Sequence, residues 1–440
     1  MKANTVIDKN TADRILKEMP FKDIGEASIR EIVKLANRLE EESGVKFLRM
    51  EMGVPGLKVS DIALEAEIKA FKDGYAAKYA PIQGIQPLKN EISRFVKNFL
   101  DIDISPDYCF ATVGSAQGST ALFMVANRTD RNKRGVLFID PGFPVQKLQI
   151  KVLGYDYDSF DVFNYRGSKL RKKLEELIIE RRISSILYSN PNNPTWISFT
   201  DEELKIIGEL ATKHNVIVIE DLAYFGMDFR KDYSKPGEPP YQPTVAKYTD
   251  NWTMLISSSK AFSYAGQRVG MMVISEKVFN WRFPDLKRFY ATDQFGHSLI
   301  YNALYILSAG VSHTPQYGLA ALLKAVNDGE YNYRDDVIEY GKRAKAMKKI
   351  FSDNGFKLVY DNDLGEPVAD GFYFTVSYPG MTGSELLHNL LYYGISAIAL
   401  QTTGSERTEG LRACVSQIGE DLLPELERRL KLFHENFSDL

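Results

Sequence analysis

Cysteine is scarce in this chain of 440 residues. There are two, Cys109 and Cys414, which are too few for a disulfide framework and lack the spacing of a zinc motif. Both lie in apolar, strand-like runs, so we expect buried free thiols and a reducing, cytoplasmic location. The five histidines are scattered without ligand spacing, and a metal site is therefore not expected.

A strong charge of either sign and a long apolar run are also missing. The net charge is −3 and 26% of the residues are charged, which is typical of a soluble globular protein. Without a basic surplus, binding to nucleic acid is not expected. The sequence has no signal-peptide pattern and no run long enough to span a membrane. The chain is long enough to bury a large core and to form two domains.

Strand and helix patterns alternate along the middle of the chain. Short apolar, β-branched runs predict strands at residues 109–113, 136–139, 155–160, 185–188, 216–220, 252–256 and 271–274. Such alternation predicts an α/β fold in which helices cover both faces of a mainly parallel sheet. Ligands bind beyond the carboxyl ends of such strands, and the candidate motifs follow those ends.

The two ends of the chain show a different pattern. Residues 8–43 are polar with helical periodicity and precede Gly44, which predicts an N-terminal helix. The C-terminal part predicts an α+β arrangement, with strands at 356–360, 372–376, 395–400 and 411–415 and a helix at 421–436. We therefore expect a smaller α+β domain built from residues 1–60 and 321–440, and a large domain at 61–320.

The stretch 256–270 carries Lys260 in a serine cluster and Arg268 eight residues later. A lysine on a loop between two core strands is costly unless it is paired or used chemically. Desolvation and a nearby cation favour a nucleophilic amine, which suits a Schiff base. Ser257, Ser259 and Arg268 would suit a phosphate, so the pattern suggests pyridoxal phosphate. A surface loop with a solvated lysine and arginine fits this short pattern equally well.

Three loops near predicted strands offer ligand contacts. Ser115 and Ala116 lie in a small-residue turn before an apolar helix, where free N–H groups can hold a phosphate. Phe143 follows a predicted strand and would stack on a flat ring, or pack in the core. Gly53 lies in a Gly/Pro loop and would let the backbone approach a ligand, or form an ordinary turn.

Two further strand ends carry polar side chains. Prolines make the turn at 190–195 rigid, which would place the Asn193 amide for a hydrogen bond to a ring hydroxyl. Asp221 ends an apolar strand and would pair with a protonated pyridine nitrogen, while Tyr224 would reach the ring oxygen. The alternative for Asp221 is an N-cap of the next helix.

Arg412 lies within a predicted strand near the C-terminus, where a cation is out of place unless it binds an anion. An arginine fork would hold a substrate α-carboxylate through two hydrogen bonds. An edge-strand arginine facing solvent is the alternative, and Arg407 in the preceding loop competes for the same role.

Taken together, these residues resemble the fold-type I pyridoxal-phosphate aminotransferases, the class I/II family that includes aspartate and aromatic aminotransferases. The resemblance runs from about Gly53 to Arg412, in the same order and with similar spacing. It rests most strongly on three motifs: Ser257-Ser258-Ser259-Lys260 with Gly266-Gln267-Arg268-Val269-Gly270, Asn190-Pro191-Asn192-Asn193-Pro194-Thr195, and Asp221 with Tyr224.

The resemblance implies a seven-stranded sheet and a role for each ring-binding residue. Lys260 would form the internal aldimine and later carry the proton between the substrate Cα and the cofactor. Asp221 would pair with the ring nitrogen, Asn193 and Tyr224 with the ring oxygen, and Phe143 would stack on the ring.

The remaining roles concern phosphate, substrate and a second subunit. Tyr79, in a Tyr-x4-Gly-x3-Leu motif, would reach the phosphate of the neighbouring subunit, so the resemblance implies a homodimer with shared active sites. The phosphate would be held by Ser115, Ala116, Ser257, Ser259 and Arg268. The substrate carboxylate would be held by Gly53, Asn193 and Arg412.

The family usually has glycine after Asn-Pro-Thr, and here Trp196 stands in that place. The resemblance implies transfer of an amino group from an L-amino acid to a 2-oxo acid such as 2-oxoglutarate, by a ping-pong mechanism through pyridoxamine. The alternatives are β-elimination by a C–S lyase or decarboxylation on the same fold, and a non-enzymatic ligand sensor ranks below both. Aspartate or glutamate, aromatic and aliphatic donors all remain open.

Overall fold

The computed structural model describes residues 5–133 and 135–438, which form two compact units. The large unit comprises Leu57–Asn192 and Ser198–Val337. The small unit comprises the described residues of Met1–Gly56, Asn193–Ile197 and Ile338–Leu440. The domain limits 1–60, 61–320 and 321–440 remain our proposal. Within the described part of the chain, no helix has both the length and the apolar content needed to cross a membrane.

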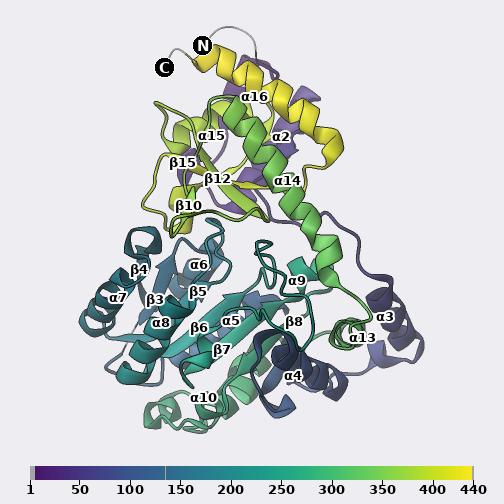
Figure 1. The fold of residues 1–440 in the computed structure, drawn as a ribbon, viewed down its shortest axis with the longest axis vertical. Coiled ribbons are helices and arrows are strands. Elements are labelled where there is room, and N and C mark those ends of the chain that lie inside the picture. Colours follow the sequence, from purple (N-terminus) through teal and green to yellow (C-terminus); the bar gives the residue numbers. More distant parts are fainter. Residues whose placement is uncertain (1–4, 134, 439–440) are drawn as a thin grey trace. The chain divides into compact units, whose positions relative to one another are not determined.

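A seven-stranded sheet forms the centre of the large unit (Figure 1). Its strand order is β2–β8–β7–β6–β5–β3–β4, in which β8 is antiparallel to both neighbours and the other pairs are parallel. The strands are β2 (Cys109–Thr112), β3 (Gly135–Asp140), β4 (Asp156–Asp161), β5 (Ile183–Ser189), β6 (Ile217–Leu222), β7 (Trp252–Ser257) and β8 (Gly270–Ile274). The predicted α/β fold with a mainly parallel sheet is confirmed.

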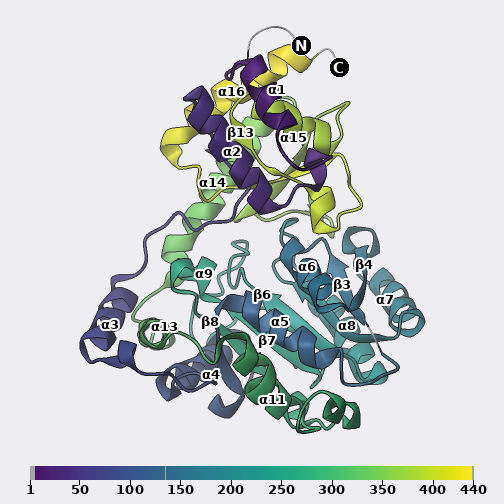
Figure 2. The same ribbon diagram turned by 180° about the vertical axis from the view of Figure 1, so that it is seen from behind.

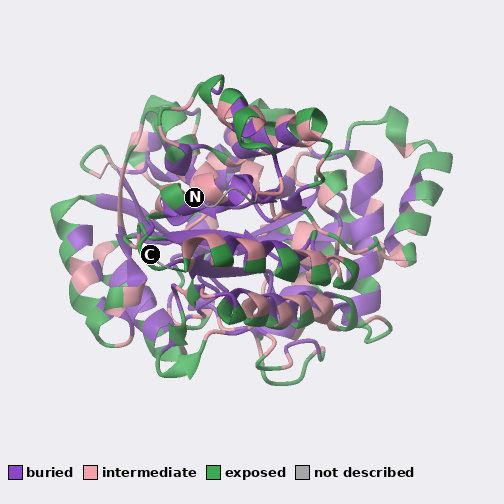
Figure 3. Ribbon diagram, turned by 90° about the horizontal axis from the view of Figure 1, so that it is seen from above, coloured by how far each residue is buried: buried purple, intermediate pink, exposed green. Residues whose placement is uncertain are grey.

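Helices cover both faces of this sheet, because most of its strands are buried on both sides and bring apolar side chains to each face. Figure 1 shows α8 (Asp201–His214) in front of the strands, and Figure 2 shows α5 (Gly114–Ala126) on the opposite side. The other helices of the unit are α3 (Asp61–Lys72), α4 (Gln86–Leu100), α6 (Pro144–Leu153), α7 (Lys169–Glu180), α9 (Ser258–Ala261), α10 (Glu276–Asn280), α11 (Phe295–Ser298), α12 (Tyr305–Ser308) and α13 (His313–Asn327). Most of the strands are buried, and many exposed residues lie on the outer helix faces (Figure 3).

The small unit contains a four-stranded antiparallel sheet of order β14–β15–β12–β9 and a parallel pair, β1 with β13. Its strands are β1 (Leu48–Arg49), β9 (Lys357–Leu358), β12 (Tyr373–Ser377), β13 (Ile395–Ser396), β14 (Ile398–Ala399) and β15 (Gly410–Cys414), beside the hairpin β10 (Asn362–Asp363) and β11 (Glu366–Pro367). Its helices are α1 (Lys9–Lys17), α2 (Ile29–Ser43), α15 (Gly383–Leu391) and α16 (Leu423–Phe437), with α14 (Tyr333–Asp353) starting just before the unit boundary. Pairing of β1 with β13 explains why both ends of the chain are needed for this unit.

The single N-terminal helix expected at 8–43 is wrong. The segment forms α1 (Lys9–Lys17), a 3₁₀ turn (Ile24–Glu26) and α2. Pro20 cannot occupy a helix interior, because it has no N–H to donate. Ser28 then starts α2 with a capping box, in which its hydroxyl accepts from the Glu31 N–H and the Glu31 carboxylate accepts from the Ser28 N–H.

Candidate active site

Strand register brings two of the predicted segments to one end of the large sheet. Thr112, at the end of β2, pairs with Gly270 at the start of β8, and Gly270 also pairs with Ser257 at the end of β7. The turn into α5 and the two ends of the β7–β8 loop, which carries Lys260 and Arg268, therefore lie at adjacent positions. Sequence alone did not show this register.

The first turn of α5 and the Arg268 guanidinium form one cradle. Gly114 starts α5 with a φ of +67°, which is a left-handed conformation. A Cβ at Gly114 would lie 2.3 Å from Nη2 of Arg268, so the guanidinium lies directly against the turn. Ser115 and Ala116 follow in this first turn, where backbone N–H groups have no partner within the helix. A helix N-terminus with an adjacent guanidinium is suited to a phosphate.

Arg268 has no acidic partner among the residues that the structure describes. Its Nη1 donates to the backbone oxygen of Ala265 at 2.9 Å, and its own φ is +51°. The side chain is exposed, so its charge remains available to an anion.

Lys260 lies half-buried in the short helix α9, between β7 and β8. The Ser257 hydroxyl caps this helix by accepting from the Ser259 N–H at 3.1 Å. Further along the loop, the buried Tyr264 hydroxyl donates to a Glu67 carboxylate oxygen at 2.5 Å. These contacts fix the loop at both sides of Lys260.

Asp221 lies near the end of β6 and is 5% exposed. Its Oδ2 accepts from Nε2 of Gln146 at 2.7 Å, and its Oδ1 accepts from the Ala223 N–H at 3.1 Å. Burial raises the pKa of this carboxyl to about 6, and the two hydrogen bonds offset part of that rise. A protonated ring nitrogen is the kind of cationic partner that such a carboxylate favours.

The loops after β3 and β5 are tied to the loop of Asp221. The Asn190 N–H donates to the Asp221 backbone oxygen at 3.1 Å, and the Asn192 amide donates to the Pro141 oxygen at 2.7 Å. Phe143 is the half-buried N-cap of α6, one helical turn before Gln146. Tyr224, three residues after Asp221, is buried.

Arg412 is placed with Gly53 in the small unit. Its side chain is 1% exposed, its Nη2 donates to the Glu51 oxygen at 2.5 Å, and its Cζ lies 4.6 Å from the centroid of the Tyr373 ring. A Cβ at Gly53 would lie 2.0 Å from the Tyr373 hydroxyl oxygen, so Tyr373 links the two predicted residues. The competitor Arg407 lies instead over the Tyr360 ring, 5.4 Å from its centroid.

Asn193 and Trp196 belong to the segment of the small unit contributed by Asn193–Ile197, and both are buried. Tyr79 lies in a loop of the large unit and is 95% exposed. The structure of a single chain therefore gives Tyr79 no place in its own site.

Sequence reasoning missed Gln146 and Tyr373. Gln146 lies three residues after Phe143 in the first turns of α6, and helical spacing would have placed both near one face. Tyr373 stands beside the core residues Phe372 and Phe374 on β12, and no local signal distinguishes it from them.

The chemistry of these residues fits pyridoxal phosphate. The large unit offers a phosphate cradle with a guanidinium, a lysine on a fixed loop, and a buried carboxylate whose described partners, Gln146 and the Ala223 N–H, are neutral. When bound, this cofactor acts as an electron sink for carbanion chemistry.

Comparison with known proteins gives the same result. The model of the family "Aminotransferase class I and II" matches residues 47–430. The aspartate aminotransferase of Pyrococcus horikoshii is 23% identical over 357 residues, which are 78% of this chain and 81% of that protein. The S-alkyl-thiohydroximate lyase of Arabidopsis thaliana is 24% identical over 216 residues, which are 49% of this chain and 44% of that protein.

Among solved structures, the aspartate aminotransferase of Thermotoga maritima superposes with a TM-score of 0.74 at 19% identity, and covers 96% of this chain and 99% of that chain. This likeness supports the fold-type I architecture. The family match extends over most of the sequence. This chain therefore belongs to the class I and II aminotransferases, which are pyridoxal-phosphate-dependent enzymes.

Proposed function

We propose that this enzyme transfers the amino group of an L-amino acid to a 2-oxo acid, with 2-oxoglutarate as the acceptor, in a ping-pong reaction. The observation that carries the proposal is Arg412, a buried guanidinium without an acidic partner in the described chain. A buried cation is costly unless an anion reaches it, and both the donor and the acceptor of transamination carry a carboxylate beside the reacting carbon.

The proposed roles follow from the chemistry of each side chain. Lys260 would bind the cofactor through its side-chain amine. Once the substrate amino group has displaced it, the free amine would carry the proton to and from the substrate α-carbon. Asp221, positioned by Gln146, keeps the ring nitrogen protonated. Asn193 and Tyr224 donate to the ring oxygen, and Phe143 stacks on the ring.

Phosphate and carboxylate are bound by separate groups. The α5 N-terminus at Ser115 and Ala116, the Ser257 and Ser259 hydroxyls and the Arg268 guanidinium take the phosphate. Arg412 takes the α-carboxylate through two parallel hydrogen bonds, together with the Gly53 backbone and the Asn193 amide. Holding the cofactor by its phosphate and the substrate by its carboxylate would orient the substrate α-carbon for proton transfer.

We also propose a homodimer in which Tyr79 reaches the phosphate of the partner site. The 95% exposure of Tyr79 supports this, because its hydroxyl is accessible to a second chain. An apolar stripe on α3 offers a surface for such a contact: Leu64, Ile68 and Phe71 recur at helical spacing and are 45%, 44% and 60% exposed. A cytoplasmic location is part of the proposal, supported by two buried cysteines without disulfides.

The proposal is tested by the absorbance spectrum of protein incubated with pyridoxal phosphate, followed by single-turnover reactions with a panel of L-amino acids. We expect a visible band that is absent in Lys260→Ala and retained in Lys172→Ala, which removes an exposed lysine of α7. One class of amino acid should convert the band to that of the amino form, and 2-oxoglutarate should restore it. Failure of every donor to change the spectrum would overturn transamination.

β-Elimination by a C–S lyase is a second candidate, because one relative is named an S-alkyl-thiohydroximate lyase. The two reactions differ in their products. A lyase releases ammonia from a cysteine conjugate without any 2-oxo acid, whereas a transaminase stops after one turnover until an acceptor is added. Measuring ammonia with and without 2-oxoglutarate separates them, and decarboxylation would instead release carbon dioxide.

A further inference from the structure

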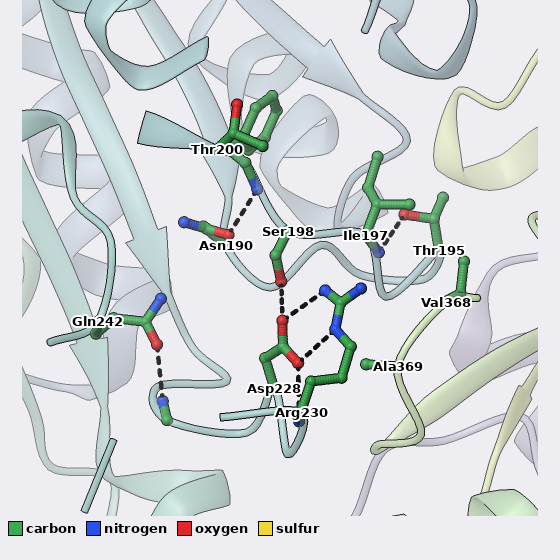
Figure 4. Close-up of polar contacts among 12 residues, drawn as sticks. Asn190, Thr195, Ile197, Ser198, Thr200, Asp228, Arg230, Gln242, Val368 and Ala369 are labelled. Atoms are coloured by element: carbon green, nitrogen blue, oxygen red, sulfur yellow. Dashed lines mark hydrogen bonds and ion pairs between the residues drawn. The ribbon is translucent and has the colours of Figure 1, made fainter. Parts of the chain in front are cut away.

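Trp196 occupies a backbone conformation that disfavours a bulky side chain. Its φ is +62°, in the left-handed region where glycine is usual. The turn is closed across Trp196 by the Thr195 hydroxyl, which accepts from the Ile197 N–H at 3.2 Å (Figure 4). Just beyond the turn, the Asn190 amide oxygen accepts from the Phe199 N–H at 3.2 Å. Because the indole is also fully buried, packing must compensate for the strained backbone.

Gly371 provides the space for the indole. A Cβ at Gly371 would lie 2.0 Å from both Nε1 and Cε2 of Trp196. The φ of Gly371 is outside the left-handed region, so its backbone does not itself demand glycine. The glycine is therefore required by the indole, and the two residues form a complementary pair.

The indole contacts the ring that lies against Arg412. Trp196 and Tyr373 meet edge to face, with ring centroids 6.2 Å apart at 67°. On its other sides, Tyr373 has its hydroxyl against Gly53 and its ring beneath the Arg412 guanidinium. A continuous set of contacts therefore runs from Trp196 through Tyr373 to Arg412.

Few other described contacts orient the Arg412 guanidinium. One nitrogen, Nη2, donates to the Glu51 oxygen, and the buried Nε has no hydrogen-bond acceptor within the described residues. A guanidinium held by one backbone oxygen and one ring face depends strongly on the position of that ring.

We propose that Trp196 is a positioning residue for the carboxylate site, acting through Tyr373 on the Arg412 guanidinium. The indole replaces the small residue usual at this place in the turn, and Gly371 makes room for it. The inference rests on the proposed function only for the identity of the ligand, an α-carboxylate. The packing of Trp196, Tyr373 and Arg412 is independent of the reaction.

The kinetic test compares Trp196→Gly and Trp196→Phe in the cofactor-loaded enzyme, with the donor that reacts and with 2-oxoglutarate. Arg412 would hold the carboxylate before and during the reaction, so its displacement weakens binding more than it slows chemistry. In Trp196→Gly we expect KM for both substrates to rise about tenfold while kcat changes less than about threefold. Trp196→Phe should restore most of the KM, because a ring again supports Tyr373.

Phe433→Leu is the matched control, because Phe433 is a fully buried aromatic of α16 in the same unit that contacts Phe356 and Tyr378 rather than Tyr373. It should lose stability and leave both KM values unchanged. An equal rise of KM in this variant would show that any cavity in the unit has the same effect, and would overturn the proposal.

Gly371→Ala tests the complementary pair. In the presence of Trp196 the new methyl group clashes with the indole, so KM should rise and stability should fall. In the Trp196→Gly background the methyl group enters vacated space and should cost nothing further. Additive effects of the two substitutions would contradict the pairing.

Crystal structures of the Trp196→Gly and Trp196→Phe variants separate this inference from the proposed reaction. In Trp196→Gly we expect the Tyr373 ring to move by about 1 Å or more toward the vacated space, with the Arg412 guanidinium following it. Unmoved rings would overturn the inference, whatever the kinetics show. If no substrate reacts, the proposed function fails while this measurement still decides the positioning role. If the glycine variant does not fold, Trp196→Leu takes its place in each test.

Discussion

Gly114 and Arg268 fit so closely that a Cβ added at residue 114 would lie 2.3 Å from Nη2 and 3.1 Å from Cζ of the arginine. Two features of this position require glycine: its φ of +67°, and the guanidinium that occupies the space of a side chain. The first helical turn and the phosphate-binding cation are thus held in one arrangement by the absence of a side chain.

Replacing Gly114 by alanine should therefore damage both the fold and cofactor binding. We expect the backbone strain to cost about 1–2 kcal/mol of unfolding free energy. Displacement of Arg268 should raise the Kd for pyridoxal phosphate at least about tenfold, because a charge-assisted contact is lost. Urea unfolding of the cofactor-free protein and equilibrium dialysis measure the two effects.

Gly154→Ala is the control for strain alone. Gly154 ends α6 with a φ of +72°, and nothing lies within 4 Å of its added Cβ. This variant should lose similar stability and keep the Kd of the cofactor. Equal losses of affinity in both variants would show that Arg268 does not depend on Gly114.

Asp221→Asn should stabilise the cofactor-free protein in alkaline solution. The folded pKa of Asp221 is raised to about 6 from an unfolded value of 3.8, so stability is full below pH 4 and is lost as pH rises through about 6. At pH 8 the buried charge costs about 3 kcal/mol of unfolding free energy. Asparagine removes this cost, but its unpaired amide N–H offsets part of the gain. We expect a gain of about 2 kcal/mol at pH 8 and none at pH 4, by urea unfolding.

Glu220→Gln separates a structural carboxylate from a cofactor-binding one. Glu220 precedes Asp221 on β6 and points to the opposite face of the sheet, where it accepts from the Thr244 and Tyr188 hydroxyls at 2.6 and 2.8 Å. Burial raises its pKa to about 7, so its variant should also gain stability at pH 8 and none at pH 4. Affinity for pyridoxal phosphate should fall only in Asp221→Asn; a similar fall in both would contradict the proposed ring contact.

Two of the buried arginines, Arg412 and Arg166, should respond to methionine in opposite ways. Arg166 donates to both carboxylate oxygens of Glu203 at 2.7 and 2.9 Å, so Arg166→Met leaves a buried charge and should cost about 3–5 kcal/mol. Arg412 has no acidic partner in the described chain, so Arg412→Met should be neutral or stabilising by about 1 kcal/mol.

The same Arg412→Met variant should lose substrate binding, because no cation remains for the α-carboxylate. We expect KM to rise about a hundredfold for donor and acceptor alike. Arg412→Lys should recover only part of this, since an ammonium cannot make two parallel hydrogen bonds. A large loss of stability together with unchanged KM would show that Arg412 is structural.

Much of the fold follows from patterns within the sequence. All seven strands of the large sheet were predictable from local patterns. Six of them are short, fully buried runs, whereas β4 is polar and partly exposed. Lys260 and Asp221 were singled out because a charge beside a buried strand requires a partner. Pro20 could also have predicted that the N-terminal segment forms two helices. The helical periodicity on both sides of it instead suggested one continuous helix.

The missing information concerns contacts between segments far apart in the chain. Gln146 gains its role only because α6 brings it to Asp221, which is 75 residues away in the sequence. Tyr373 matters because Gly53, Trp196 and Arg412 surround it, and none of these is its neighbour along the chain. Both cases depend on how distant segments pack against one another, which no local pattern in the sequence specifies.

Tyr79 provides the test of a shared active site. In the proposed dimer, each site combines Lys260 of one chain with Tyr79 of the other, so Lys260→Ala and Tyr79→Asp should each inactivate their own homodimer. Aspartate at residue 79 would repel the phosphate of the partner site. A heterodimer of the two variants regains one native site, and random mixing should therefore restore about a quarter of the wild-type activity. Mixing Lys260→Ala with the double variant, Lys260→Ala and Tyr79→Asp, leaves no functional lysine and should restore nothing. Formation of heterodimers without activity in the first mixture would show that Tyr79 serves its own chain.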